Sequence, residues 1–201
     1  EADADTVPTL VATLLSDGRS ILLGTTAEAV DPQVERARLA QELATATSEG
    51  GDESLKVGLY GNITPVEDAT VKVWKAICLD KRSGKVRWER ELHRGVPAIK
   101  RHTKATHSNS TLATDGTRIV AFLGSEGLHA LDMTGKPLWK QDLGVLDSGF
   151  FRVPEAQWGF ASSPILDDGL VIVQADVQKG SFVAAFDAAT GKERWRTART
   201  D

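Results

Sequence analysis

Histidines and basic side chains gather in one stretch of the chain, residues 93–109. Three of the four histidines lie in or beside it, and two of them, His102 and His107, are five residues apart. Such a pair could bind a metal ion or act as an acid and a base. No third ligand is obvious, and the simpler alternative is that these side chains hold the loop through hydrogen bonds to the backbone. A third possibility is recognition of an anion or a partner by the basic residues Lys100, Arg101 and Lys104.

A second stretch, residues 144–159, ends in a carboxylate, an amide and an aromatic ring. These are Glu155, Gln157 and Trp158. A ring beside a carboxylate suits a planar or a cationic ligand, although Trp158 could equally pack against its neighbours. Asp176, in a short polar segment farther along, adds a second carboxylate.

Other catalytic signatures are absent from the sequence. It contains no Gly-x-Ser-x-Gly element, phosphate-binding loop, His-Glu-x-x-His pair or dinucleotide fingerprint. Cys78 is the one cysteine, so the chain can form no internal disulfide and no zinc site built on two or four cysteines. Any chemistry must therefore be sought in the polar segments described above.

Composition indicates a folded domain without a strong electrostatic preference. The chain has 201 residues, of which 41% are hydrophobic and 26% charged, and a net charge of −4. This balance gives no general reason to bind nucleic acid or an anionic membrane surface. No apolar run approaches the roughly 18 residues of a membrane span, so we expect no transmembrane segment.

The elements that position these residues are repeated. An Asp, a Gly and a Trp recur three times in the same order. The tryptophans of successive copies are 51 and 56 residues apart. The three copies are Asp80, Gly84 and Trp88; Asp132, Gly135 and Trp139; and Asp187, Gly191 and Trp195. We expect these Asp-Gly-Trp sets to be structural, with the tryptophans packing between units. An Asp-Gly pair, typical of a hairpin turn, precedes each copy at residues 17–18, 115–116 and 168–169.

Each unit is predicted to contain four short antiparallel strands, the pattern of a β-propeller blade. Blade one is predicted at about residues 7–92 with an insertion at 26–69, blade two at about 110–143, and blade three at about 161–198. The insertion is expected to hold a surface helix that begins at Asp31-Pro32 and ends at Gly50-Gly51. The fold class is therefore all-β, about three four-stranded blades with one helical insertion.

Strand order decides which loops share a face. In such a blade the connection between the second and third strands and the connection to the next blade lie at one end. All the long connections fall there, and binding sites usually lie on loops carried by a rigid scaffold. We therefore place the candidate ligand- or partner-binding residues on this loop-rich face: His102, Lys104, His107, Asn109, Glu155, Gln157, Trp158 and Asp176.

The repeated Asp-x-x-Thr/Ser-Gly-Lys-x-x-Trp motif resembles the pyrroloquinoline quinone (PQQ) repeat. That repeat occurs in quinoprotein alcohol dehydrogenases and in the propeller lipoprotein of the outer-membrane assembly machinery. Longer stretches, such as 107–111, 122–127 and 154–159, are similar to a PQQ-binding-like propeller family of secreted bacterial proteins. The resemblance implies a propeller of seven or eight blades, so we expect the chain to be an N-terminal part of it, completed by the remaining blades. It also implies a periplasmic or secreted location.

Two classes of function follow from the resemblance. The first is a binding or scaffold module, with no catalytic role, whose loop-rich face recognises a protein, a glycan or a small ligand. The second is a quinoprotein-type oxidoreductase that binds PQQ and calcium, with its site completed by other blades. Asn109, Glu155 and Asp176 are residue types that hold calcium in that family, but the vicinal cysteine pair of those enzymes is missing. The basic loop alone motivates a third idea, an accessory protein for carbohydrates or sulfate esters.

Overall fold

The computed structural model describes the backbone of residues 9–14, 19–27, 65–66, 69–102, 105–149 and 159–200. Side chains are described for 69–102, 105–149 and 159–200. The regular secondary structure in these ranges is all β-strand apart from one 3₁₀ turn, η2 (Gly124–Glu126). No helix within these ranges is long and apolar enough to cross a membrane. The helix expected between Asp31 and Gly51 lies outside the described residues.

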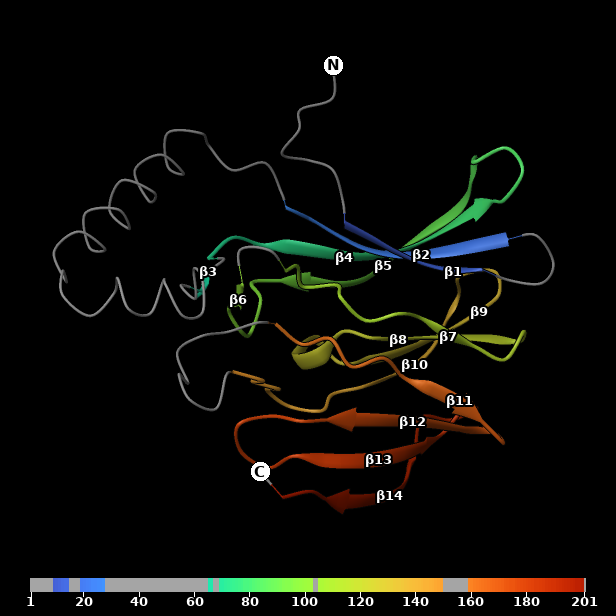
Figure 1. Ribbon diagram of the computed structural model, residues 1–201. Coiled ribbons are helices and arrows are strands. Elements are labelled where there is room, and N and C mark those ends of the chain that lie inside the picture. Colours follow the sequence, from blue (N-terminus) through green and yellow to red (C-terminus); the bar gives the residue numbers. More distant parts are fainter. Residues whose placement is uncertain are drawn as a thin grey trace, which may run out of the picture.

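Three four-stranded antiparallel sheets follow one another along the chain (Figure 1), which confirms the predicted propeller-blade architecture. Blade one consists of β1 (Thr9–Leu14), β2 (Arg19–Ala27), β4 (Lys72–Asp80) and β5 (Val86–Gly95). Blade two consists of β7 (Ala113–Thr114), β8 (Arg118–Phe122), β9 (Leu128–Asp132) and β10 (Pro137–Gln141). Blade three consists of β11 (Ile165–Asp167), β12 (Leu170–Ala175), β13 (Phe182–Asp187) and β14 (Glu193–Ala198).

The order of strands within each sheet is their order in the chain, so successive connections alternate between the two ends of the sheet. One end carries the hairpin turns that follow the first and third strands, and we call it the turn face. The other end carries η2, the turn at residues 176–181 and the connections between blades, and we call it the loop face. A further pair of two-residue strands, β3 (Pro65–Val66) and β6 (Arg101–His102), joins segments on this second face.

The turn between the third and fourth strands is fixed by the aspartate of the repeat motif. In blade three, Asp187 Oδ1 accepts hydrogen bonds from the Thr190 hydroxyl and the Thr190 N–H, both at 2.9 Å. In blade two, Asp132 Oδ1 accepts the hydroxyl of Thr134 at 2.6 Å and its N–H at 2.8 Å. These bonds favour the ionised carboxylate and hold the pKa of both aspartates below the usual range. The repeated sequence motif is thus a repeated turn.

The repeat tryptophans of blades one and two lie on the glycine turn of the next blade. The indole N–H groups of Trp88 and Trp139 donate to backbone oxygens of that turn, at 3.2 Å and 3.0 Å. A Cβ added at Gly135 would lie 2.7 Å from the Trp88 ring, and one at Gly191 would lie 2.7 Å from the Trp139 ring. Both glycines also have left-handed φ angles, +82° and +73°. Any larger residue would therefore meet both backbone strain and the ring.

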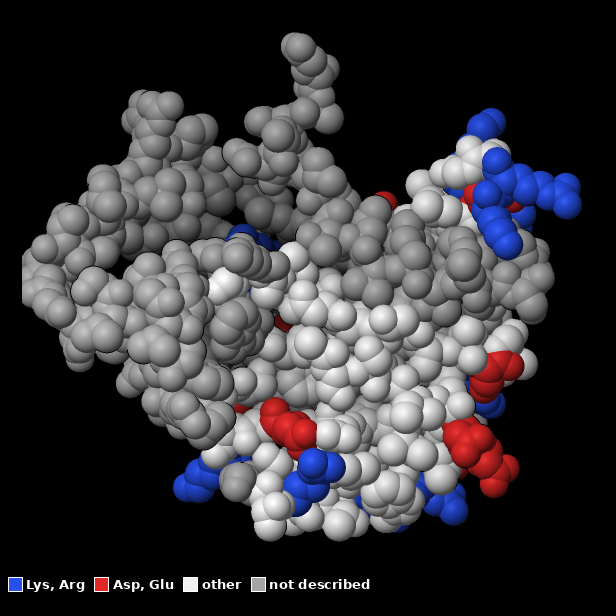
Figure 2. Space-filling view, viewed as in Figure 1, with Lys and Arg blue, Asp and Glu red and all other residues white. Residues whose placement is uncertain are grey.

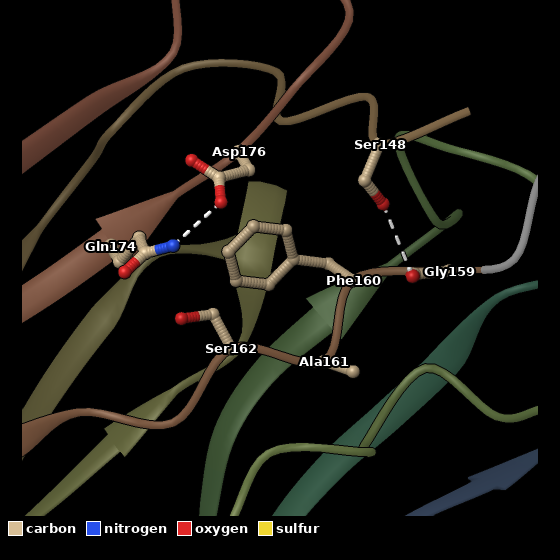
Figure 3. Close-up of a pocket in the computed structure, with 7 residues that line it drawn as sticks. All are labelled: Ser148, Gly159, Phe160, Ala161, Ser162, Gln174 and Asp176. Atoms are coloured by element: carbon tan, nitrogen blue, oxygen red, sulfur yellow. Dashed lines mark hydrogen bonds between the residues drawn. The ribbon is translucent and has the colours of Figure 1, made fainter. Parts of the chain in front are cut away.

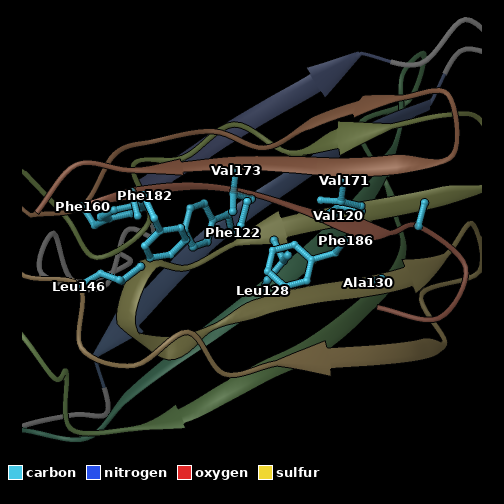
Figure 4. Close-up of a cluster of buried hydrophobic side chains, with 13 residues drawn as sticks. Val120, Phe122, Leu128, Ala130, Leu146, Phe160, Val171, Val173, Phe182 and Phe186 are labelled. Atoms are coloured by element: carbon cyan, nitrogen blue, oxygen red, sulfur yellow. The ribbon is translucent and has the colours of Figure 1, made fainter. Parts of the chain in front are cut away.

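Apolar side chains fill the space between neighbouring sheets. Trp74, Cys78 and Leu131 belong to the cluster between blades one and two. A larger cluster joins blades two and three, with Phe122 and Phe186 near its centre (Figure 4). Burial of this kind stabilises by about 25 cal/mol for each Å² of apolar surface removed from water. The blades therefore support one another, as expected for a repeat architecture.

One row of apolar side chains across blade three is exposed at its two ends. Cross-strand partners place Ile165, Ile172, Ala185 and Trp195 in one row across its four strands. Ile165 is 60% exposed and Trp195 is 42% exposed. The expected packing of Trp195 between two sheets stays a prediction, because no described sheet follows blade three.

Candidate functional site

His102 and His107, the pair considered for metal binding, contact different neighbours. His102 is buried in β6, and its carbonyl oxygen accepts the N–H of Ala105 at 2.9 Å. His107 lies beside the fully buried Trp74, with ring centroids 6.1 Å apart, and its carbonyl oxygen accepts the indole N–H at 2.9 Å. No group of three or more His, Cys, Asp or Glu side chains able to hold a metal ion occurs within the described ranges.

Asn109 closes the loop that leads into blade two. Its Oδ1 accepts the N–H and the hydroxyl of Thr106, both at 3.1 Å. Its Nδ2 donates to the carbonyl oxygen of Thr106 at 2.5 Å and reaches that of Phe160 at 3.5 Å. Both ends of the amide are therefore engaged in holding the backbone, and the second bond links blade two to blade three.

Asp176 lies on a shallow pocket of about 250 Å³ at the loop face of blade three (Figure 3). Phe160 forms part of the wall, and Ser148, Ser162 and Gln174 add polar atoms. Asp176 already has two partners, since Gln174 Nε2 donates to its Oδ2 at 2.5 Å and Arg199 Nε lies 2.9 Å from its Oδ1. Its carboxylate is half exposed and paired.

Four of the predicted binding residues cannot be placed. Lys104, Glu155, Gln157 and Trp158 lie outside the described residues. The predicted binding role of the carboxylate of Glu155 and the ring of Trp158 on the loop-rich face thus stays a prediction. Among the residues that are described, His102, His107 and Asn109 share one loop, and Asp176 lies on a different blade.

The η2 turn of blade two bridges the two connections between blades. Glu126 Oε1 accepts the N–H of Ala98, from the connection after blade one, at 3.0 Å. Ser125 Oγ accepts the N–H of Leu146, from the connection after blade two, at 2.9 Å. Glu126 is only 7% exposed, so its carboxylate serves the protein interior rather than solvent. Adjacent residues of one short turn therefore fix both connections in place.

Each of these fixed connections exposes a valine. Val96 is 53% exposed and lies two residues before Ala98, while Val145 is 68% exposed and directly precedes Leu146. Ala98 is exposed as well. We call Val96, Ala98 and Val145, on either side of η2, the valine patch. These aliphatic side chains are carried by connections that η2 holds in place, which makes the valine patch a candidate contact point on the described part of the loop face.

One buried and one partly buried histidine lie close to Glu126 of η2. The ring of His129 on β9 is 5% exposed, and its Nε2 lies 3.0 Å from the carbonyl oxygen of Glu126. Burial lowers the pKa of His129 to about 4, and the nearby Lys140 and His93 act in the same direction. Burial also lowers the pKa of His93, whose ring is 5.1 Å from that of Trp74. The lowered pKa values of His93 and His129 both favour the neutral imidazole.

Sequence reasoning missed the residues that organise this face. Glu126 and Ser125 belong to a Gly-Ser-Glu-Gly segment that reads as an ordinary hairpin turn. A glutamate between two left-handed glycines, at φ +66° and +104°, is the signal that could have drawn attention to it. Trp74 is fully buried but stands outside the repeating set of tryptophans, so the repeat gave it no role.

The similarity of this sequence to known protein families identifies the family to which the chain belongs. Residues 74–201, more than half of the chain, match the family model described as outer membrane protein assembly factor BamB, a PQQ-like repeat family. The chain belongs to this family. The BamB-type match begins at Trp74 and takes in the three Asp-Gly-Trp sets of the repeat.

Among solved structures, the crystal structure of BamB from Moraxella catarrhalis is 25% identical, with a TM-score of 0.43. The match covers 63% of this chain and 33% of that protein, so the chain spans about a third of its length. No curated protein matches the chain.

Proposed function

We propose that the chain is a protein-binding scaffold that contacts its partner through the valine patch. One observation carries the proposal: η2 fixes two separate connections, and each presents an exposed valine beside it. A partner that covers these aliphatic side chains gains their burial without the cost of ordering a loop.

Membership of the BamB family supports a role in assembly rather than in catalysis. The family description names an assembly factor of the outer membrane, and assembly factors act by binding other proteins. By the same reasoning we place this chain in the periplasm or outside the cell. The exposed Trp195 supports a further blade packed on blade three, because the equivalent tryptophans of the first two blades lie on the turn of the next blade.

The quinoprotein alternative fits the described residues less well. A calcium-bound quinone needs free oxygen ligands, but the amide of Asn109 closes its own loop and the carboxylate of Asp176 is paired with Arg199. We expect the full-length protein to retain no visible chromophore after incubation with PQQ and calcium. A retained quinone band together with bound calcium would restore the oxidoreductase hypothesis.

Site-specific photo-crosslinking tests the protein-binding proposal. A photoreactive phenylalanine analogue is placed at position 96, 145 or 138 of the full-length protein, which is then irradiated in its own cells. Leu138 is the matched control, since it is 44% exposed but lies on the outer strand β10, away from η2. We expect the same partner to be captured from positions 96 and 145 and not from 138. Capture of one protein equally from all three positions would refute a defined patch.

A further inference from the structure

Three basic groups meet at the loop-face end of the seam between blades one and two. His129 comes from β9, Lys140 from β10 and His93 from β5, and the latter two act on the His129 ring through their charge. His129 and Lys140 are cross-strand partners, so their side chains leave blade two on the same side. Leu131, two residues after His129, packs between blades one and two. Described strands of both blades therefore flank this cluster.

The carboxylates that face the cluster are already engaged. Glu126 of η2 accepts the N–H of Ala98 at 3.0 Å, and Glu91 of β5 pairs with Arg94 at 2.8 Å. The charges of both carboxylates reach the histidine of β5, but neither carboxylate forms an ion pair with it. Among the described residues, Lys140 also has no carboxylate within ion-pair distance. A proton added to the cluster would therefore lack an ion-pair partner.

The position of Lys140 is neutralised within the blade in the other two sheets. The residue after the repeat tryptophan is Glu89 in blade one, where it pairs with Lys75 at 2.6 Å. It is Arg196 in blade three, where it pairs with Glu193 at 2.7 Å. Figure 2 shows acidic and basic side chains lying next to one another on other parts of the surface. Lys140 faces two histidines instead, so the basic cluster is not a general feature of the repeat.

The ring of His129 also holds η2 in place. It is buried, and its Nε2 lies 3.0 Å from the carbonyl oxygen of Glu126, whose carboxylate fixes Ala98. Because a carbonyl oxygen only accepts, the neutral ring donates its proton from Nε2. A second proton would have to enter at Nδ1, and the resulting cation would lie buried beside Lys140 and His93. The ring can take up that proton at low cost only where it reaches water, away from η2.

We propose that η2 is an acid-sensitive latch: proton uptake by His129 releases it, and with it the two connections that carry the valine patch. Only the consequence for a partner rests on the proposed function. In the closed latch the pKa of His129 is lowered from 6.5 to about 4, whereas the released ring regains its ordinary pKa. Acid therefore favours the open state, and the linkage makes opening about twentyfold more frequent at pH 5 than at pH 7.

Hydrogen exchange of single amides in the full-length protein tests the latch. The amides of Ala98 and Leu146, which bond to the side chains of η2, report its opening. The amide of Asp132, bonded to the Lys136 carbonyl oxygen at the turn face of the same blade, is the control. After correction for intrinsic exchange rates, we expect about twentyfold more opening at pH 5 than at pH 7 for the first two amides and no change for the control. An equal rise at all three amides would overturn the latch, because it would mean that the blade unfolds as a whole.

Two variants connect the opening to the basic cluster. His129→Gln should abolish the rise at low pH, and an undiminished rise would overturn the assignment to this ring. Lys140→Gln, at an exposed position, should keep the fold and reduce the rise, because one cation that opposes protonation of the ring is gone. Lys136→Gln removes an exposed cation from the other end of β10 and should leave the rise unchanged. Equal effects of the two lysine variants would refute a local cause.

The latch also predicts how a partner at the valine patch responds to acid. A protein that contacts both Val96 and Val145 binds only the closed latch, so it should suppress the opening of the Ala98 and Leu146 amides at pH 5. The protein captured by photo-crosslinking is the probe. If nothing is captured, the proposed function fails while the exchange data still decide the latch. If a partner is captured and exchange at Ala98 and Leu146 does not depend on pH, the patch stands and the latch is wrong.

Discussion

The contact between a tryptophan and the glycine turn of the next blade predicts unequal effects for two similar substitutions. Gly84 and Gly191 occupy the same position of the repeat and have nearly equal φ angles, +69° and +73°. Alanine at either position must adopt a left-handed backbone, which costs about 1–2 kcal/mol. At Gly84 nothing else changes, because no atom of the described residues lies within 4 Å of the new Cβ.

At Gly191 the new Cβ would lie 2.7–3.0 Å from three ring atoms of Trp139. The ring must move, and overpacking of this kind costs about 1–3 kcal/mol. The indole N–H would also lose its 3.0 Å hydrogen bond to the turn, worth about 1 kcal/mol. Gly191→Ala should therefore destabilise by about 2–4 kcal/mol more than Gly84→Ala.

Urea unfolding of the two variants, followed by circular dichroism, measures this difference. For a chain of this size it corresponds to a gap in melting temperature of roughly 4–16 °C. The double variant Gly191→Ala/Trp139→Ala should be less destabilised than the sum of its single variants, because removing the ring removes the clash. Equal losses at Gly84 and Gly191, or strict additivity in the double variant, would refute the packing argument.

Four more substitutions test other contacts. Trp139→Ala should lower the free energy of unfolding in urea by about 3 kcal/mol, and Trp195→Ala by less than about 1 kcal/mol, because the Trp195 ring is 42% exposed and no described sheet covers it. Similar losses would mean that the two rings have similar surroundings. The pKa of His129 is lowered from 6.5 to about 4 in the folded chain, so the unfolded chain binds the proton first. The free energy of unfolding should therefore fall by about 3 kcal/mol as the pH drops from 6.5 to 4. His129→Gln should flatten this part of the pH profile, and an unchanged slope would contradict the assignment. Glu126→Ala should speed hydrogen exchange of the Ala98 amide by one to two orders of magnitude and leave the Leu146 amide unaffected, since the lost acceptor serves one connection only. Faster exchange at both amides would mean that η2 itself had unfolded.

The architecture could be predicted from the sequence because the repeat fixes both ends of each hairpin. The Asp-Gly pairs and the Asp-to-Trp motif mark turns, and apolar β-branched runs such as 119–122 and 170–173 lie between them. Local signals and the period agree there, and the strands form where the pattern predicts. The pairing of β3 with β6 was not predictable, since two residues on each side carry no periodic signal.

The organisation of the loop face depends on contacts that no local pattern encodes. Glu126 and Ala98 are 28 residues apart, and Ser125 and Leu146 are 21 apart. Each bond joins a side chain to a backbone N–H, and every residue except proline has such a donor. Candidate residues chosen by type, such as Asn109 and Asp176, proved to be engaged in holding the structure. Residue type alone could not separate a ligand site from a loop support.

The most direct test of the central claim is the affinity of the partner captured from the valine patch. That protein is titrated against the full-length wild type, against Val96→Asp/Val145→Asp, and against Val86→Asp/Leu138→Asp as a control that adds the same two negative charges at exposed positions outside the patch. The account predicts at least a thirtyfold loss of affinity in the patch variant, with unchanged melting temperature, and no loss in the control, because a carboxylate buried without a partner opposes binding. Equal affinity in the wild type and the patch variant would show that the loop face of this chain does not bind through its valines.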